Sequence, residues 1–492
     1  MRPTRTRAGS VSSRHREDTT RQPSSIVIVG SGFAGFECAR RLSRLLRRHR
    51  SDATVTLISP VDYLLYTPLL PEVAGGTIDP RFATVPLNDM LPGVRLFRAY
   101  VDSVDLTARS LHCRDQENTS YELSWDRLVL TPGSISRLFD IPGLAEHARG
   151  LKSISQALYL RDHIIEQFEL SRSDGDRERA AARRTVVVVG SSYSGTELIA
   201  QLCAMASVAA HDFGFEPGEV RLILVERSGR MMPELSAELA ARAEQVLRRR
   251  GVQILVGVTL SRVAPDHVVL SDGTRIGTYT VAWVAGVVAN PVIAATGLPT
   301  EKGRLKVGSD LQVPGFDGVY AGGDAAAVPD ATNPGTITPP TAQHASRQGK
   351  VLARNVAASL GYGRAQKYRH RDLGTVVDLG PGFAVADPLN VQLSGFAAKV
   401  VTRLYHLYAI PRNANRLAVA LGYLINSLFA RPLVSIGFAQ SSLARFSVSE
   451  EFMSASAMMH PSDEQMYTDE LRYQKASAER TASPRTATEP VS

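Results

Sequence analysis

The sequence contains very little cysteine. Its 492 residues include three cysteines, Cys38, Cys113 and Cys203, and no two of them form a C-x-x-C pair. This spacing excludes a four-cysteine metal site, a disulfide framework and a thiol relay between neighbouring cysteines. We therefore predict no bound metal and a reducing compartment.

The chain also lacks a secretory signal, because its Arg-, Ser- and Thr-rich start has no apolar core. We interpret residues 1–24 as a disordered basic arm. A mitochondrial-type presequence is the alternative, weakened by Glu17 and Asp18. The polar residues 441–492 read as a disordered tail. The basic arm, with six arginines against Glu17 and Asp18, carries +4 of the net charge of +8. No nucleic-acid-binding motif accompanies this charge, so we expect no nucleic-acid partner.

A chain of this length predicts two or three domains. An apolar β-branched run, residues 25–29, passes directly into Gly30-Ser31-Gly32-Phe33-Ala34-Gly35 and then into a helical segment that reaches about His49. In this G-x-G-x-x-G pattern Gly30 permits a tight turn, Gly32 lets a pyrophosphate approach the backbone, and Gly35 lets the helix pack closely. The free N–H groups of the helix favour phosphate. We predict a dinucleotide site; the alternative is a Gly-rich turn in another kind of α/β protein.

Three further features of this first half bear on the site. A second strand, residues 53–58, ends in Ser59, where an acid that binds ribose is expected. The loop at residues 62–70 has the Pro and apolar residues that suit packing on a flat ring. A strand predicted at 121–130 leads into Thr131-Pro132-Gly133. A helix at 153–169 and a charged linker at 174–184 follow.

A second copy of the opening pattern follows that linker. Residues 185–189 form an apolar strand that enters Gly190-x-Ser192-x-x-Gly195, with serine at the second glycine position. The spacing differs from the G-x-S-x-G elbow of serine hydrolases. The next strand ends in Glu226, which suits the ribose hydroxyls of NAD and repels a 2′-phosphate. Arg227 and Arg230 keep NADPH open. Two such turns imply two nucleotides, FAD and NAD(H).

Two later strands complete the pattern. Residues 280–287 read as a buried strand with a turn at Gly286. Residues 317–324 read as a strand that delivers Gly323 and Asp324. Asp324 suits a ribityl hydroxyl or a place near a pyrophosphate, and its alternative role is a helix N-cap. A helix is expected from Thr341.

Four stretches together resemble the flavoproteins with two dinucleotide domains, and type II NADH dehydrogenase in particular. They are residues 30–37, 62–74 (beginning DYLLYTPLL), 282–290 (AWVAGVVAN) and 320–324 with 342–348 (AQHASRQ). The chain departs from the family pattern at Ser59, Pro132, Ser192 and Arg347, which makes it a divergent member.

The resemblance implies an α/β fold with two Rossmann-like domains. The FAD domain would comprise residues 25–150 and 301–360, and the NAD(H) domain residues 151–300. The implied reaction takes hydride from NADH to FAD and electrons on to a quinone. Glu197 would lie beside the nicotinamide and Gln343 near flavin and acceptor. Further cofactor contacts would come from Thr67, Pro68, Leu69 and Ala342.

The last predicted segment, residues 361–440, carries two amphipathic helices separated at Pro411. Apolar residues recur at helical spacing from Phe396 to Tyr408 and from Leu417 to Leu428, and we expect Lys399 and Arg403 elsewhere on the surface. Neither run reaches the roughly 20 apolar residues of a membrane span. Such helices suit a peripheral anchor, which the resemblance places on the cytoplasmic side of the cell membrane. A dimerisation face, and with it a homodimer, is the alternative.

Three other functions stay open from the sequence. One is a soluble reductase of a ferredoxin- or rubredoxin-type protein. Another is a sulfide:quinone reductase, which needs a cysteine pair that is not apparent. The third is a redox-silent nucleotide-binding protein on the same fold.

Overall fold

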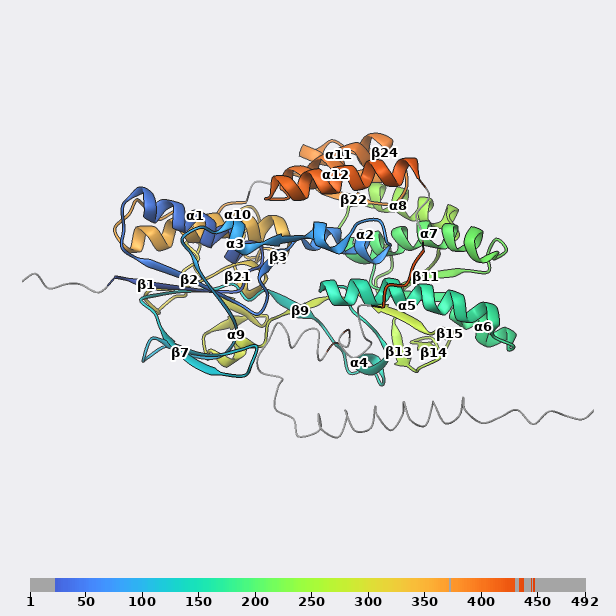
Figure 1. Ribbon diagram of the computed structural model, residues 1–492, viewed down its shortest axis with the longest axis horizontal. Helices are drawn as coiled ribbons and strands as arrows, with labels where there is room; N and C mark the ends of the chain where they lie inside the picture. Colours follow the sequence, from blue (N-terminus) through green and yellow to red (C-terminus); the bar gives the residue numbers. More distant parts are fainter. Residues whose placement is uncertain (1–22, 371–372, 430–432, 438–443, 445, 447–492) are drawn as a thin grey trace, which may run out of the picture.

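The computed structural model describes residues 23–370, 373–429, 433–437, 444 and 446, so nearly all of the predicted basic arm and tail lies outside the described residues. Two sheet-and-helix units lie end to end, and the C-terminal helices lie along one side of the molecule (Figure 1). The predicted α/β class with two nucleotide-binding folds is confirmed.

The first sheet has the doubly wound arrangement. Its described strands follow the order β20-β8-β1-β2-β5-β6-β7, in which β20, β8, β1, β2 and β5 run parallel and β6 and β7 antiparallel. The chain leaves β1 for β2 on one side and later returns to β8 on the other. This reversal creates a crevice at the carboxyl end of β1, where ligands bind in such sheets. The strands are β1 (Ser25–Val29), β2 (Thr54–Ser59), β5 (Arg95–Asp105), β6 (Ser110–Asp115), β7 (Ser120–Ser124), β8 (Arg127–Leu130) and β20 (Val319–Ala321).

The second sheet repeats this plan. Its described strands follow the order β12-β11-β10-β16, all parallel, with the reversal at the carboxyl end of β10. The strands are β10 (Thr185–Val189), β11 (Arg221–Glu226), β12 (Gln253–Val256) and β16 (Thr280–Trp283). All four residues from Val186 to Val189 are buried, as expected for a parallel strand that is covered on both faces.

Helices cover the faces of both sheets. The longer helices are α1 (Phe33–Arg48), α5 (Ile154–Ser173), α7 (Tyr193–Phe213), α8 (Ala237–Arg249), α10 (Ala342–Ser359), α11 (Phe396–Ala409) and α12 (Asn413–Leu428). The short ones are α2 (Leu70–Ala74), α3 (Leu87–Met90), α4 (Leu144–His147), α6 (Arg177–Arg183), α9 (Val292–Ala295) and the 3₁₀ turns η1 (Thr67–Leu69), η2 (Pro80–Ala83), η3 (Gly323–Ala325) and η4 (Pro388–Asn390).

The remaining strands form small sheets. These are β3 (Tyr63–Leu65) with β4 (Thr84–Pro86), β9 (Ser134–Ser136) with β17 (Val287–Ala289), β13 (Leu260–Val263) with β14 (His267–Leu270) and β15 (Arg275–Gly277), β18 (Thr300–Glu301) with β19 (Arg304–Lys306) and β21 (Ala326–Ala327), and β22 (Val376–Asp378) with β23 (Ala384–Ala386) and β24 (Leu393–Gly395).

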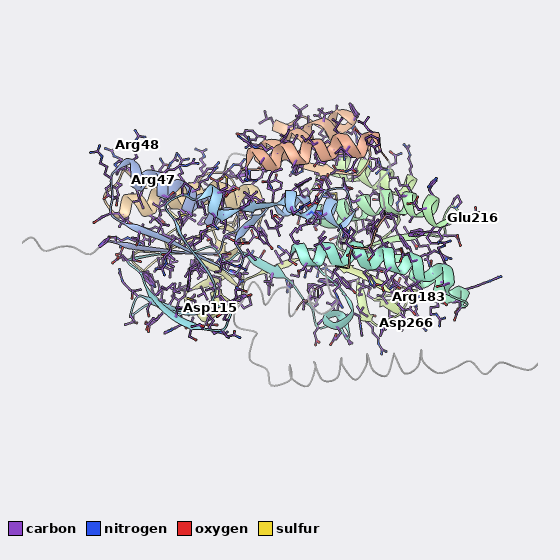
Figure 2. The ribbon with its side chains drawn as sticks, viewed as in Figure 1. Arg47, Arg48, Asp115, Arg183, Glu216 and Asp266 are labelled. Atoms are coloured by element: carbon purple, nitrogen blue, oxygen red, sulfur yellow. The ribbon has the colours of Figure 1, made fainter. Side chains whose placement is uncertain are left out.

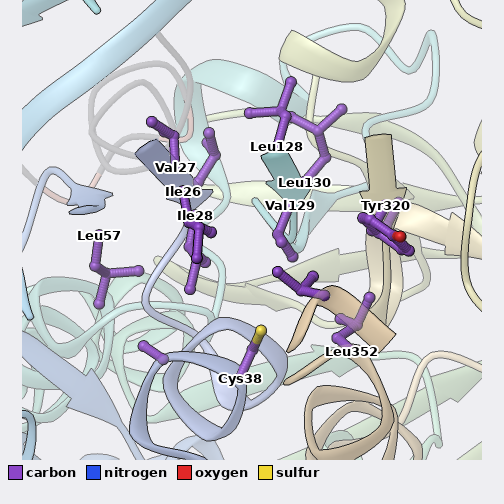
Figure 3. Close-up of a cluster of buried hydrophobic side chains, with 14 of the residues drawn as sticks. Ile26, Val27, Ile28, Cys38, Leu57, Leu128, Val129, Leu130, Tyr320 and Leu352 are labelled. Carbon is purple, nitrogen blue, oxygen red and sulfur yellow. The ribbon is translucent and has the colours of Figure 1, made fainter. Parts of the chain in front are cut away.

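The first core forms between β1, β8 and β20 and the two helices α1 and α10 (Figure 3). Ile26 and Ile28 on β1 face Cys38 of α1 and Leu352 of α10, and all four side chains are buried. Because α10 begins nearly 300 positions after the end of α1, this core joins the start of the chain to residues 319–357. The domain boundaries proposed from the sequence stay a prediction.

Three predictions of local secondary structure were wrong. The buried strand expected at 280–287 ends at Trp283, and β17 begins only at Val287. The single strand expected at 121–130 is divided into β7 and β8, with Trp125 and Asp126 between them. The charged linker at 174–184 contains α6, because the Asp176 carboxylate accepts hydrogen bonds from the N–H groups of Glu178 and Arg179 and so caps a helix. A residue composition typical of a linker does not exclude a well-capped short helix.

Candidate functional site

The first glycine turn has the backbone geometry that a dinucleotide requires. Gly30 has φ +97°, and a Cβ there would clash with the carbonyl of Thr131. A Cβ on Gly35 would clash with the carbonyl of Gly30, which shows how closely α1 approaches the turn. A Cβ on Gly32 would meet no atom within 4 Å. The space in front of Gly32 is therefore open, as an approaching pyrophosphate requires.

The start of α1 leaves this space electropositive. Gly32 is the N-cap, and no described side chain caps the helix. Phe33 lies beside the turn with its ring edge-on to Tyr66, 5.8 Å between centroids. The residues present thus fit the pyrophosphate of FAD, since the first-turn N–H groups of α1 face an open region with helix-dipole charge.

The second turn repeats the same geometry. Gly190 has φ +100°, and a Cβ on Gly195 would clash with the carbonyl of Gly190. Ser192 is the N-cap of α7, and its hydroxyl makes no cap hydrogen bond. A side chain at this position is therefore compatible with the turn, although it occupies part of the space that a glycine would leave.

The two halves differ where the second strand ends. In the first, the hydroxyl oxygens of Ser31 and Ser59 lie 2.7 Å apart and share a buried hydrogen bond. In the second, Glu226 accepts hydrogen bonds from the N–H and Oγ of Ser191, at 2.8 and 2.7 Å. Ser31 and Ser191 occupy the same place in their turns. The structure therefore places a hydroxyl in one half where the other has a carboxylate.

The charge of Glu226 is stabilised within the protein. Burial by itself would raise the pKa of this carboxyl, but hydrogen bonds from Ser228 and Ser191 outweigh that effect and hold the pKa below its ordinary value. Glu226 is therefore ionised at neutral pH. A carboxylate has acceptor capacity beyond these bonds, so its suitability for ribose hydroxyls stands as a prediction.

Asp324 and Gly323 lie where β20, α1 and α10 meet. A Cβ on Gly323 would lie 3.2 Å from the Cβ of Ala34 and 3.7 Å from that of Ala345. Asp324 accepts a hydrogen bond of 2.6 Å from Ser134, and the Lys152 ammonium donates to the same hydroxyl. Asp324 is half-buried in η3 rather than at the N-cap of a long helix.

The strand-end loops that face these turns lie between the two sheets. Thr131 donates its hydroxyl to the carbonyl of Val29 at 2.8 Å, and Pro132 follows it beside Gly30. The carbonyl of Gly133 accepts from the N–H of Asn290. Gly286, with φ +86°, precedes β17, which pairs with β9. The segments after β8 and β16 are therefore joined.

The turn η1 lies against the second unit. Pro68 and Leu69, together with Pro71, Glu72, Glu197, Gln201, Asp378 and His406, line a cavity of about 10 Å³, near the lower limit for one water molecule. Thr67 begins the same turn. The structure thus brings the predicted flavin loop next to Glu197 of α7.

Charged groups gather around this cavity. The ammonium of Lys399 donates to both oxygens of Asp378, at 2.6 and 2.5 Å, and to the carbonyl of Gly380. The Glu197 carboxylate accepts from the N–H of Asp378 at 3.0 Å. Tyr423 donates to Glu72 at 2.9 Å. All five side chains that take part are buried, and their contacts link α2, α7, β22, α11 and α12.

These surroundings favour the protonated form of two carboxyls. Burial, then the nearby charge of Asp378, raises the pKa of Glu72 to about 7, although Lys399 and Tyr423 oppose the shift. Burial also raises the pKa of Glu197 well above its ordinary value. Burial lowers the pKa of His406 to about 4, so its imidazole is neutral and shares a hydrogen bond with Tyr66.

Gln343 lies on the first turn of α10, directly after Ala342. Its side-chain N–H donates to the carbonyl of Gly374 at 3.0 Å, and its oxygen accepts from Arg347 at 3.0 Å. Arg347 also lies 3.3 Å from a ring nitrogen of His370. The side chains of Gln343 and Glu197 both hydrogen-bond to the backbone of residues 374–378, Gln343 to the carbonyl of Gly374 and Glu197 to the N–H of Asp378.

His344 is buried and its Nδ1 lies 2.8 Å from the hydroxyl of Tyr368, which gives it a structural role in this arrangement.

Lys399 corrects the sequence prediction. It was expected on the surface, yet its side chain is 5% exposed because it neutralises Asp378. Sequence reasoning also missed Glu72, Asp378 and His406. The available signal was the polar stripe of Lys399, Thr402 and His406 at spacing i, i+3, i+7, which is opposite the apolar stripe of the same helix.

Comparisons with known proteins place this geometry in a family. The sequence profile described as pyridine nucleotide-disulphide oxidoreductase matches residues 24–349. A type II NADH:quinone oxidoreductase of Mycobacterium tuberculosis is 29% identical over 439 residues, covering 85% of this chain and 91% of the relative. The demethylphylloquinone reductase NdbB of Synechocystis is 29% identical over 412 residues, covering 82% and 96%.

The fold also matches a solved structure. The structure of NDH2 from Plasmodium falciparum in complex with NADH superimposes with a TM-score of 0.78 at 17% identity, covering 84% of this chain and all of that one. This likeness confirms the predicted fold. The names of the relatives confirm the resemblance to type II NADH dehydrogenases that was inferred from the sequence motifs.

Proposed function

The chain belongs to the pyridine nucleotide-disulphide oxidoreductase family, and we propose that it is a single-chain, FAD-dependent NADH:quinone oxidoreductase that works at a membrane surface without pumping protons. The observation that carries the redox part is the pair of equivalent glycine turns, each at the reversal point of its own parallel sheet. The relatives named as NADH:quinone oxidoreductases support the same reaction.

FAD, when bound, accepts hydride from NADH and passes electrons to the quinone. The protein holds and orients the reactants. The N–H groups of the first turn of α1 bind the FAD pyrophosphate, and Glu226 accepts from the ribose of NADH. In this proposal Glu197 borders the nicotinamide, while Gln343 and the cation of Arg347 face the acceptor.

Quinone reduction consumes two protons, and the interior can hold protons close by. The raised pKa values of Glu72 and Glu197 leave protons on these carboxyls near neutral pH. We propose that they hold protons beside η1, in a region where the small cavity leaves little bulk water. In this proposal Glu72 and Glu197 act as proton donors, and not merely as carboxylates that bind cations.

The redox proposal is tested by Gly32→Val, with Gly175→Val as its matched control. A Cβ at either glycine meets no atom within 4 Å, and neither has a positive φ, so both variants should fold. Gly32→Val should lose FAD and its yellow colour, because the added methyl groups occupy the place of the pyrophosphate. Gly175→Val should keep flavin that NADH bleaches. Normal flavin content in Gly32→Val would contradict the assignment of this turn.

The membrane part of the proposal is carried by the unusual orientation of α11 and α12. Their buried faces are mostly polar: Lys399, Thr402, His406, Asn415 and Tyr423 are buried there, together with the apolar Ala398 and Val419. Their apolar residues point outward, and we call these the outward apolar face: Phe396, Val400, Leu404, Tyr408, Leu417, Leu421, Leu424, Ile425, Leu428 and Phe429 are 39–79% exposed. So large an apolar surface needs a partner.

A lipid surface suits this partner. Across the part of the chain that the structure describes, no helix has the length and apolar character to cross a bilayer. Helices that lie in the interface bury an apolar face to a shallow depth. We therefore propose peripheral attachment on the cytoplasmic side of the cell membrane, where NADH is available. A homodimer that buries the same face is the second candidate.

Leu421→Asp with Leu424→Asp tests the attachment. Both side chains are about half exposed, 48% and 54%, so the fold should survive. The variant should leave the membrane and lose turnover with a lipid-soluble quinone, yet keep turnover with a water-soluble acceptor. Leu170→Asp, at a 40% exposed leucine on α5, is the control. Release of the unmutated protein by salt alone, or a variant that dimerises less but stays attached, would refute lipid contact.

A further inference from the structure

The two helices that cover the first core carry a dense positive charge. From Phe33 to Arg50 the sequence has one acid, Glu37, and the six arginines Arg40, Arg41, Arg44, Arg47, Arg48 and Arg50. From Ala342 to His370 it has no Asp or Glu, and the basic residues Arg347, Lys350, Arg354, Arg364, Lys367 and Arg369. We call the exposed part of these residues on α1, α10 and 361–369 the α1–α10 basic surface.

These charges lie close together and are poorly neutralised inside the protein. α1 and α10 pack so tightly that a Cβ on Gly349 would clash with the carbonyl of Ala34. The pKa of Arg41 is lowered first by burial and next by the charge of Arg354. Glu37 forms an ion pair of 2.7 Å with Arg40. The uncompensated positive charge calls for anions from outside the protein.

The basic side chains reach solvent. Arg44, Arg47, Arg48 and Lys350 are all exposed. Figure 2 shows Arg47 and Arg48 at the end of α1, on the side of the molecule along which α11 and α12 also lie. In this view Arg47 and Arg48 therefore lie on the same side of the molecule as the two helices that carry the outward apolar face.

Contacts at the end of α1 connect the two surfaces. Arg47 donates to the carbonyl of Pro92 at 3.1 Å. Three residues earlier, Asp89 forms an ion pair of 2.9 Å with Arg412, which precedes α12. Residues 89–92 thus bridge the C-terminal end of α1 and the start of α12, a helix that carries the outward apolar face.

A second connection follows the chain beyond α10. The basic residues of 364–369 precede Leu373, which is 41% exposed. The carbonyl of Leu373 accepts from the N–H of Leu389, which is 64% exposed. In the sequence, exposed apolar residues thus follow the basic segment after the intervening residues 370–372.

We propose that the α1–α10 basic surface binds the headgroups of an anionic phospholipid bilayer while the outward apolar face enters its interface. This inference rests on the proposed membrane attachment and adds a lipid preference that originates in the FAD-binding unit. The observation that selects a bilayer is the continuity of positive charge with an exposed apolar face, because a lipid surface offers negative headgroups and an apolar interior at once. A soluble polyanion such as nucleic acid would leave the apolar face uncovered.

The test compares two triple variants of the full-length flavoprotein that remove equal charge. One is Arg44→Gln with Arg48→Gln and Lys350→Gln. The control is Arg177→Gln with Arg262→Gln and Arg275→Gln, three exposed residues on α6, β13 and β15, which Figure 1 shows on the opposite side from α11 and α12. Binding is measured by flotation with vesicles of phosphatidylcholine alone and with vesicles that also contain phosphatidylglycerol, at low and high salt.

The unmutated protein should bind both vesicles and prefer the anionic ones at low salt. Each basic residue near an anionic surface contributes about five-fold, so the first triple variant should lose about 100-fold of that preference while it binds phosphatidylcholine normally. High salt should abolish the same preference in the unmutated protein. The control should change neither quantity.

Three results would overturn the inference. They are an unchanged anionic preference in the first variant, an equal loss in the control, and binding of a labelled oligonucleotide through Arg44, Arg48 and Lys350 without any lipid preference. In each of these the proposed membrane attachment survives if phosphatidylcholine binding persists. Binding to neither vesicle would instead refute the attachment itself, and the lipid preference with it.

Discussion

Removing the charge of Lys399 should release the C-terminal helices, because this ammonium holds α11 against the second unit. Lys399→Met keeps the length of the side chain but leaves Asp378 buried without a cation. It also leaves the carbonyl of Gly380 without its side-chain donor. Breaking a buried ion pair by removing one partner costs about 3–5 kcal/mol.

Hydrogen–deuterium exchange of α11 measures this effect locally. A loss of about 3–5 kcal/mol in the free energy of opening corresponds to about 10²- to 10⁴-fold faster exchange of the α11 amides, at roughly 1.4 kcal/mol per factor of ten. Limited proteolysis between β22 and α11 should accelerate in parallel. The strands of the first sheet should keep their protection, because Lys399 lies outside that core.

Two controls make the reasoning refutable. Arg412→Met removes a partner from the exposed ion pair with Asp89, whose side chains are 35% and 52% exposed, and should cost less than about 1 kcal/mol. Asp378→Asn combined with Lys399→Met removes both charges and should recover most of the protection. If Lys399→Met exchanged no faster than Arg412→Met, or if the double variant recovered nothing, compensation of a buried charge would be the wrong explanation.

Three other outcomes follow from the same site. The unmutated enzyme should have a higher kcat/KM with NADH than with NADPH, because Glu226 repels a 2′-phosphate, and Glu226→Ser should reduce this difference. Equal kcat/KM for the two nucleotides in the unmutated enzyme would refute the role of Glu226. Replacing Cys38, Cys113 and Cys203 by serine should leave most of the quinone-reductase activity in protein that folds, because burial raises the pKa of each thiol and so disfavours the reactive thiolate. Loss of turnover with flavin still bound would show that a thiol takes part. The free energy of unfolding should fall by up to about 3 kcal/mol as the pH rises from about 4.5 to 7, because the raised pKa of Glu72 makes the folded protein hold a proton that the unfolded chain releases. Urea unfolding of Glu72→Gln should lack this part of the pH dependence. An identical pH dependence in both proteins would contradict it.

Sequence patterns located the parts of the site that depend on neighbours along the chain. The turns at Gly30 and Gly190 were identifiable because positive φ and close strand-to-helix packing demand glycine at fixed spacing. The end of β11 at Glu226 was identifiable because an apolar β-branched run ends there. The division of residues 120–130 into β7 and β8 was missed, since a local break in pairing has no strong composition signal.

The amino-acid sequence by itself determined the doubly wound plan, the two nucleotide turns and the presence of two amphipathic helices, because each depends on periodicity or glycine placement within one segment. The direction in which those helices turn was decided by tertiary structure. Lys399 and Tyr423 gain partners on β22 and α2, more than 20 and 350 positions away in the chain. Burial of these polar groups is favourable only with those partners present. The apolar residues of α11 and α12 consequently remain on the outside, where they require a surface that the folded chain does not itself provide.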